Sequence, residues 1–336
     1  MKTAIFGFSG SGKTDLFLAL AGPGGHNINR ARVKVPEERL DPLKDLFNPP
    51  KVTYTEIEYL DIPGGGGKGG GLGARVLNEI RAYDCLLAVL DGFSGANNPA
   101  AQWQEIETDL LISDLAVVEK KLEKMAVDKK KAKNLVNPKE EELLSKIKEI
   151  LEAEKPLREF QELAGDPILR GYCFLSAKPI LYAWNVLEDN LDQIELPVSK
   201  EKEIHIAVSA KLEKEIAELN DPEEIQMFLE DLGLKESVLH RVIKNTYQLL
   251  DLITFLTAGE KEVRAWPLKK GSTAPEAAGV IHSDLQKGFI RAEVLSWGDF
   301  LKYKDFKVAK DKGALRLEGK DYIVQDGDII TFRFNV

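Results

Sequence analysis

The chain has 336 residues, which is enough for two or three domains of typical size. Apolar residues make up 43% and charged residues 30%, a balance typical of an ordinary soluble globular protein rather than a disordered one. The net charge of −9 argues against attraction to nucleic acid over the whole surface. No apolar run approaches the roughly 18–20 residues that cross a bilayer, so we expect a cytoplasmic protein without membrane contact.

The first fourteen residues predict a phosphate-binding loop. Residues 3–6 are apolar and strand-like, and residues 15–20 have helical spacing. Between them, residues 7–14 read Gly-Phe-Ser-Gly-Ser-Gly-Lys-Thr and match G-x-x-x-x-G-K-[ST] in full. Glycines let successive N–H groups point at phosphate oxygens, and the helix N-terminus adds positive charge. The predicted phosphate ligands are Ser9, Gly10, Ser11, Gly12, Lys13, Thr14 and Asp15.

Within this loop, Lys13 is expected to reach the β- and γ-phosphates and to stabilise transition-state charge. The Thr14 hydroxyl is expected to bind Mg²⁺. After a predicted strand over residues 52–60, Asp61-Ile-Pro-Gly64 supplies the second half of such a site. Asp61 would orient Mg²⁺ through its water shell, and the Gly64 amide would face the γ-phosphate.

Two loops near these motifs are candidates for nucleotide-dependent ordering. Residues 64–73 are almost all glycine, which suits either a linker or a loop that orders on the γ-phosphate, and the position after Asp61 favours the second. Residues 21–35 contain no Thr or Ser, although a switch-type hydrolase uses a Thr there. Residues 36–47 predict a capped amphipathic helix.

A helix is predicted at residues 74–82 and a buried parallel strand at 84–91. From 104 to 163, apolar residues recur at helical spacing on both sides of a Lys-rich break at 128–133. This pattern predicts an inserted helical hairpin resembling an antiparallel coiled coil. Its charged residues are typical of a solvated face, with a partner-binding arm as the alternative.

Two further predicted strands carry the candidate base-binding residues. They cover residues 179–184 and 203–208, and ligands of doubly wound sheets bind beyond the carboxyl ends of such strands. Asn185 could brace the phosphate loop and bond a purine nitrogen, and the carboxylate of Glu188 could accept from base N–H groups. Expected base contacts at these ends are Asn185, Glu188, Ser209, Ala210 and Lys211.

Residues 216–251 are predicted to be connecting helices. From 252 to 336, short β segments dominate, with turns such as Asp326-Gly-Asp328 and one helix near 273–285. This combination indicates a small α+β domain of the β-grasp type. The doubly wound nucleotide-binding domain would then comprise residues 1–103 and 164–215.

Taken in order, these parts resemble the YchF, or Obg-like ATPase, family of P-loop nucleotide hydrolases. The resemblance covers nearly the whole chain. Lys178-Pro-x-x-Tyr-x-x-Asn-Val-x-Glu188 is similar to the family's altered base motif, which replaces the Asn-Lys-x-Asp of other GTPases. Phe255-Leu-Thr-Ala-Gly-Glu-Lys-Glu-Val-Arg-Ala-Trp266 is similar to the start of the family's TGS domain. So are Lys287-Gly-Phe-Ile-Arg-Ala-Glu-Val294 and Leu317-Glu-Gly-Lys-Asp-Tyr-Ile-Val-Gln-Asp-Gly-Asp328.

The resemblance implies hydrolysis of ATP, in preference to GTP, and association with ribosomes or RNA through the TGS domain and the hairpin. Glu188 gives a physical reason for the base preference. A GTPase Asp bonds two guanine N–H groups at one reach, and the extra CH₂ of Glu misplaces both oxygens. Such a bidentate contact is worth about 1–3 kcal/mol in base recognition.

The chain departs from the family at three places. Gly10 replaces an Asn linked to monovalent-cation dependence, the loop 21–35 lacks the switch Thr, and Gly65 stands where the family has an apolar residue. No residue that positions the attacking water is identified. The leading hypothesis is therefore a slow Mg²⁺-dependent triphosphatase acting as a translation switch. The alternative is a nucleotide-binding scaffold with little hydrolysis, and a small-molecule kinase is disfavoured because no arginine-rich lid is visible.

Overall fold

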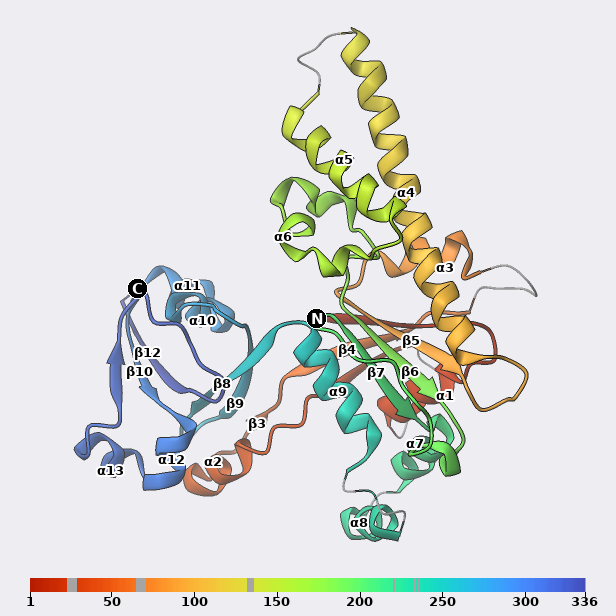
Figure 1. Ribbon diagram of the computed structural model, residues 1–336. Helices are drawn as coiled ribbons and strands as arrows, with labels where there is room; N and C mark the ends of the chain where they lie inside the picture. Colours follow the sequence, from red (N-terminus) through yellow and green to blue (C-terminus); the bar gives the residue numbers. More distant parts are fainter. Residues whose placement is uncertain are drawn as a thin grey trace. The chain divides into compact units, whose positions relative to one another are not determined.

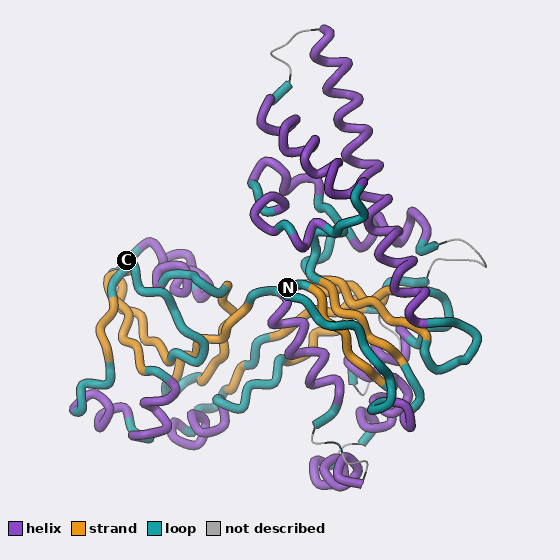
Figure 2. The backbone as a smooth tube through the Cα atoms, viewed as in Figure 1, coloured by secondary structure: helices purple, strands orange, loops and turns teal. Residues whose placement is uncertain are grey.

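The computed structural model describes residues 1–22, 29–64, 71–131, 136–219, 221–231, 234 and 236–335 (Figures 1 and 2). The chain divides into two compact units, each formed from two stretches of sequence. The first unit contains Met1–Val33 and Glu58–Leu249. The second contains Lys34–Ile57 and Leu250–Val336.

The first unit is built on a six-stranded sheet with the order β2-β4-β1-β5-β6-β7. Strand β1 pairs in parallel with β4 and β5, β5 pairs in parallel with β6, and β6 with β7. Every residue of β5 is buried, as expected for a parallel strand covered on both faces. The strands are β1 (Lys2–Phe6), β2 (Arg30–Lys34), β4 (Glu56–Asp61), β5 (Cys85–Asp91), β6 (Ile180–Asn185) and β7 (Glu203–Val208).

Helices cover both faces of this sheet (Figure 1). On one face, α3 and α4 pack Val76 and Ile106 against Leu86 and Tyr182. On the other, α9 packs on β6 and β7, and α1 packs on α7. The helices are α1 (Lys13–Ala21), α3 (Gly73–Ile80), α4 (Pro99–Lys131), α5 (Pro138–Glu152), α6 (Gln161–Ala164), α7 (Ala210–Glu218), α8 (Pro222–Asp231) and α9 (Val238–Leu249), with short 3₁₀ turns at Leu157–Glu159, Pro167–Tyr172 and Glu188–Asn190. The predicted doubly wound α/β class is confirmed.

The predicted hairpin consists of α4 and α5 (Figure 2). Val118 of α4 and Leu144 and Ile147 of α5 share one apolar cluster, as their helical spacing requires. The Asn137 side chain caps α5 by accepting from the amide of Lys139 at 3.0 Å. Helix α4 is 33 residues long and continues to Lys131, so the break expected at 128–133 begins later than predicted.

The second unit contains a six-stranded mixed sheet with the order β11-β10-β12-β8-β9-β3. One face packs against α10 and α11, and the opposite face packs against α2, α12 and α13. The strands are β3 (Val52–Thr53), β8 (Leu252–Ala258), β9 (Val263–Lys269), β10 (Phe289–Leu295), β11 (Arg316–Glu318) and β12 (Ile329–Phe334). The helices are α2 (Leu40–Phe47), α10 (Ala274–Ile281), α11 (Ser283–Lys287), α12 (Trp297–Tyr303) and α13 (Phe306–Asp311).

The structure corrects the expected domain boundaries. Residues 34–57 were expected in the nucleotide-binding domain 1–103, but they belong to the second unit. Leu40 and Leu43 of α2 are fully buried beside Leu256, and β3 pairs in parallel with β9. Burial of this apolar face outweighs closeness in sequence. The helices α8 and α9, expected to connect two domains, instead belong to the first unit.

Of the two cysteines, Cys85 is buried, whereas Cys173 is exposed at a left-handed φ of 48° after a 3₁₀ turn. Within the described ranges, no helix is long and apolar enough to span a bilayer.

Candidate functional site

The glycines of residues 7–14 hold backbone conformations that other residues rarely adopt. Gly10 and Gly12 have φ values of 81° and 83°. A Cβ on Gly12 would lie 2.1 Å from Asn185 Nδ2, so this glycine is also required by close packing. The first intrahelical bond of α1 runs from the Leu16 amide to the Gly12 carbonyl at 3.0 Å. The amides that precede Leu16 at this helix N-terminus are the donors that a phosphate needs.

Lys13, Thr14, Asp61 and Gly64 come together beside this loop. The Thr14 hydroxyl donates to Asp61 Oδ2 at 2.9 Å, which joins α1 to the end of β4. Lys13 is buried, and its Nζ donates to the carbonyl of Phe8 at 3.4 Å. A Cβ on Gly64 would lie 2.6 Å from Lys13 Nζ, so the absence of a side chain leaves room for the ammonium.

The charged groups of Lys13 and Asp61 lie in a partly desolvated environment. Burial lowers the pKa of Lys13, and the Asp61 carboxylate opposes that shift. Burial raises the pKa of Asp61, while the Thr14 hydrogen bond and Lys13 oppose it. The second oxygen of Asp61, Oδ1, is buried and has no hydrogen-bond partner among the described residues. An unsatisfied carboxylate oxygen beside a hydroxyl is the oxygen donor set that Mg²⁺ prefers.

Asn185 connects the phosphate loop to the end of β7. Its Nδ2 donates to the carbonyl of Ser11 at 2.9 Å, and its Oδ1 accepts from the amide of Ala210 at 2.9 Å. Asn185 is the last residue of β6 and is 4% exposed. Both polar atoms of the Asn185 side chain are therefore occupied by hydrogen bonds within the protein. Asn185 holds the phosphate loop and the Ser209–Ala210 turn in position relative to each other.

A pocket of about 430 Å³ opens at the carboxyl ends of β6 and β7. It extends from Gly12 and Asp15 of the phosphate loop region to Glu188 and Lys211. Parallel sheets bind ligands at this edge, and a nucleotide base is flat enough for a cleft of this size. The structure brings together here all five residues expected to contact a base, namely Asn185, Glu188, Ser209, Ala210 and Lys211.

Sequence reasoning missed several residues that line the same pocket, among them Phe93, Leu187 and Lys214. Phe93 lies in a loop fixed by Asp91, which accepts from the amides of Phe93 and Ser94 at 3.3 and 3.0 Å. The run Asp91-Gly-Phe-Ser after a buried strand is a turn signal that could have drawn attention to Phe93. Nothing in the local pattern distinguishes Lys214, whose Nζ pairs with Asp15 Oδ1 at 3.1 Å.

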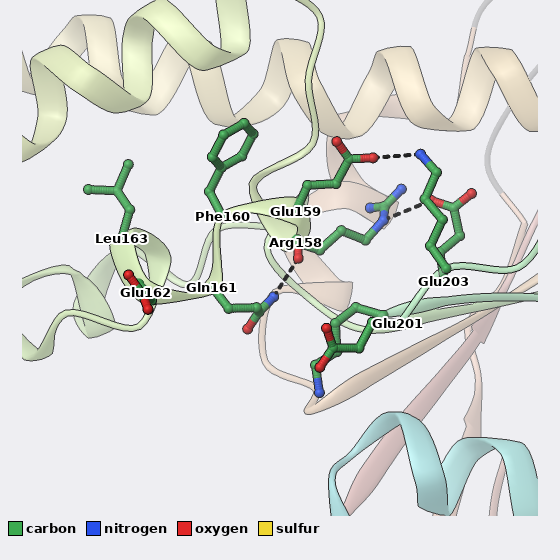
Figure 3. A pocket seen from close by; sticks show the side chains of 10 residues that line it. Arg158, Glu159, Phe160, Gln161, Glu162, Leu163, Glu201 and Glu203 are labelled. Atoms are coloured by element: carbon green, nitrogen blue, oxygen red, sulfur yellow. Dashed lines mark hydrogen bonds and ion pairs between the residues drawn. The ribbon is translucent and has the colours of Figure 1, made fainter.

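A second pocket, of about 600 Å³, lies at the opposite end of β7 (Figure 3). Four of its charged residues form two ion pairs: Arg158 Nε bonds Glu203 at 3.1 Å and Lys200 bonds Glu159 at 2.5 Å. Glu203 is the first residue of β7, so this pocket faces the amino end of that strand. Ligands of parallel sheets bind at the carboxyl ends, so we assign no ligand to this pocket. The Arg158–Glu203 ion pair forms a structural brace beside it.

His205 belongs to that brace and is not available as a ligand. The indole of Trp184 donates to His205 Nδ1 at 3.1 Å, so Nε2 carries the proton and donates to Glu203 at 3.0 Å. Burial raises the pKa of Glu203, but the His205 bond and the Arg158 guanidinium outweigh it and bring the pKa to about 2. His205 is itself buried.

The two loops expected to order with nucleotide lie partly outside the described residues. These loops are residues 21–35 and 64–73, and the structure leaves out 23–28 and 65–70. Gly65, the departure from the family next to Gly64, is among them. Outside these gaps, no group of three or more His, Cys, Asp or Glu side chains could hold a metal ion by itself.

The strand, glycine loop and helix at the N-terminus, with Asp61 at the end of the neighbouring strand β4, define a P-loop nucleoside triphosphatase.

Comparisons with known proteins identify the family within this class. A family model named YchF-GTPase_C, described as "Protein of unknown function (DUF933)", matches residues 252–335. The Ribosome-binding ATPase YchF of Bacillus subtilis is 42% identical over the full length of both chains. Its namesake in Escherichia coli O157:H7 is 40% identical and covers 100% of this chain and 99% of its own.

Solved structures agree with the sequence comparisons. The YchF GTPase of Schizosaccharomyces pombe superposes with a TM-score of 0.86 at 29% identity, over 99% of this chain and 97% of its own. A GTP-binding protein of Pyrococcus horikoshii OT3 shares the fold, with a TM-score of 0.63 at 18% identity over 100% of both chains. The chain belongs to the YchF family.

Proposed function

We propose that this protein binds ATP, and GTP less well, in a Mg²⁺-dependent manner and hydrolyses the triphosphate slowly. The observation that carries the proposal is the meeting of Lys13, Thr14, Asp61 and Gly64 at the phosphate loop. Lys13 would hold the β- and γ-phosphates and stabilise charge that develops during transfer to water. Slow turnover is expected because no described residue is placed to orient the attacking water.

Thr14 and Asp61 are the residues that would hold Mg²⁺, and their oxygen donors fit that ion. When bound, Mg²⁺ would neutralise phosphate charge. The buried, unpartnered Oδ1 of Asp61 supports this assignment, because a buried carboxylate oxygen without a partner is costly unless a ligand satisfies it.

For the base, we assign Asn185, Glu188, Ser209, Ala210 and Lys211 to the 430 Å³ pocket. Phe93 and Leu187 would add apolar contact area to the base. Asn185 would act mainly as a positioning residue, because its amide already bonds Ser11 and Ala210. Glu188 would disfavour guanine, because its side chain is one CH₂ longer than the Asp that bonds two guanine N–H groups.

The relatives named as ribosome-binding ATPases support a ribosome-associated role in the cytoplasm. We propose that residues 252–336 are a TGS domain and that this domain and the hairpin contact the ribosome. Nucleotide state would control the contact through residues 21–35 and 64–73. A scaffold with little hydrolysis remains the second candidate, favoured by the lack of Thr or Ser in residues 21–35.

Turnover and calorimetry separate these two functions. Purified protein is assayed with ATP and GTP, with Mg²⁺ or EDTA, and with or without ribosomes. The proposal predicts Mg²⁺-dependent turnover and tighter binding of ATP. Lys13→Ala should abolish turnover and weaken triphosphate binding by about 100-fold, a magnitude typical of a lost phosphate clamp. Unchanged triphosphate affinity would contradict the site, and tight binding without turnover under every condition would favour the scaffold.

A further inference from the structure

A groove of about 680 Å³ runs along the start of the hairpin, away from the nucleotide pocket. One wall is a face of α4 from Trp103 to Leu115, and the end of α5 with the residues just after it, from Leu151 to Glu154, closes the other side. The span of α4 from Trp103 to Leu115 corresponds to about 18 Å, or roughly three helical turns. A helical or extended peptide of similar length fits along such a surface.

The groove combines an apolar floor with an exposed apolar anchor. Leu111 and Leu115 are partly buried in the hairpin cluster, and Leu151 is 3% exposed. Ile112 stands out because it is 60% exposed on the same face of α4. Clustered apolar surface of this kind, as opposed to single exposed residues, marks interaction sites.

The charges that line the groove have one sign. Glu107, Glu152 and Glu154 contribute carboxylates, and the lining includes no Lys or Arg. Glu107 is bonded to Arg158 and Tyr182, and Glu152 lies 3.5 Å from Lys148. Glu154, at the end of the groove, has no ion-pair partner in the part of the chain that the structure describes.

We propose that this groove binds a basic, amphipathic protein segment of the ribosome. The Glu154 carboxylate, which has no ion-pair partner among the described residues, attracts a Lys or Arg side chain, and the apolar floor accepts the apolar face of the segment. RNA is disfavoured because its phosphates would face carboxylates, without a cation among the lining residues to neutralise them. The inference rests on the proposed ribosome association and adds which surface is used and what kind of molecule it meets.

Ile112→Asp tests the apolar anchor, and Val127→Asp is its matched control. Val127 is also exposed, at 51%, on α4 but outside the groove, so both changes place the same charge on the same helix. Co-sedimentation with purified ribosomes should show a loss of about tenfold or more in affinity for Ile112→Asp and less than twofold for Val127→Asp. ATP turnover without ribosomes and the melting temperature should stay unchanged in both variants, which shows that each is folded.

Charge reversal tests the acidic lining. The double change Glu152→Lys and Glu154→Lys should weaken ribosome binding several-fold, whereas Glu149→Lys, exposed on α5 outside the groove, should not. A photo-crosslinking amino acid at position 112 should label a basic ribosomal protein. Labelling of ribosomal RNA would overturn the inference, and so would equal ribosome binding by the groove and control variants. If the unaltered protein fails to bind ribosomes in any nucleotide state, the proposed function itself falls.

Discussion

The two ends of the proposed nucleotide site are built in different ways. At the phosphate end, main-chain amides of consecutive residues and one buried lysine form the site, and glycines at left-handed φ make that path possible. At the base end, side chains from β6, from the turn after it and from α7 meet across the sheet. Under the proposed function, the first arrangement would bind a triphosphate whatever its base, and the second would select the base. Substitutions at the phosphate end should therefore weaken binding of both nucleotides strongly, whereas substitutions at the base end should change the ATP-to-GTP affinity ratio.

The largest expected effect is at Gly12. Gly12→Ala places a methyl group 2.1 Å from Asn185 Nδ2, so either the loop or Asn185 must move. We expect a loss of about 100-fold or more in ATP and GTP affinity, measured by calorimetry. Gly10→Ala is the matched control: its φ of 81° is similar, but the position is open, so only backbone strain of about 1–2 kcal/mol is expected. Equal losses in the two variants would show that close packing at Gly12 is unimportant.

The next effect is at Asn185, which joins the two ends. Asn185→Ala leaves the Ser11 carbonyl and the Ala210 amide without these partners, a cost of about 1–3 kcal/mol for each unsatisfied buried group. We expect a lower free energy of unfolding in urea and roughly tenfold weaker binding of both nucleotides, with the ATP-to-GTP ratio nearly unchanged. A large change in that ratio would instead make Asn185 a direct reader of the base.

At the base end alone, Glu188→Asp should change selectivity. A carboxylate shortened by one CH₂ can reach two guanine N–H groups, so GTP affinity should rise relative to ATP by about 3- to 10-fold, within the range of one bidentate contact. Glu215→Asp is the control, because Glu215 also lines the pocket and is shortened in the same way. If both variants change the ratio equally, or neither does, Glu188 does not select the base.

The smallest effect concerns the pair Asp15–Lys214, which lies where the two ends meet. Asp15 places a carboxylate in the first turn of α1, and Lys214 neutralises it at 3.1 Å. Lys214→Ala should weaken ATP binding by about two- to fivefold, because an uncompensated carboxylate then repels phosphate. Adding Asp15→Asn should restore affinity. The pair is partly exposed, so its coupling in a double-mutant cycle should stay below about 1 kcal/mol; additive effects would rule out charge compensation.

The contrast between local and long-range construction also separates the features that the sequence predicts from those that it does not. The phosphate loop, the β4 Asp and the helical hairpin were predictable because each depends on neighbouring residues: a strand, a glycine turn and a helix start, or repeated helical spacing. The α/β class followed from the order of these elements. Lys13 and Thr14 could be assigned for the same reason, since the loop geometry fixes where they lie.

Contacts between distant residues required the tertiary structure. The transfer of residues 34–57 to the second unit follows from burial of Leu40 and Leu43 beside strands more than 200 residues away, which no local pattern encodes. Phe93 and Lys214 line the proposed base pocket only because the fold brings β5, β6 and α7 together. Sequence by itself determined the phosphate end of the proposed site, which main-chain groups of consecutive residues form, because that geometry is local. The base end, which side chains of distant residues form, was decided by which strands the fold places side by side.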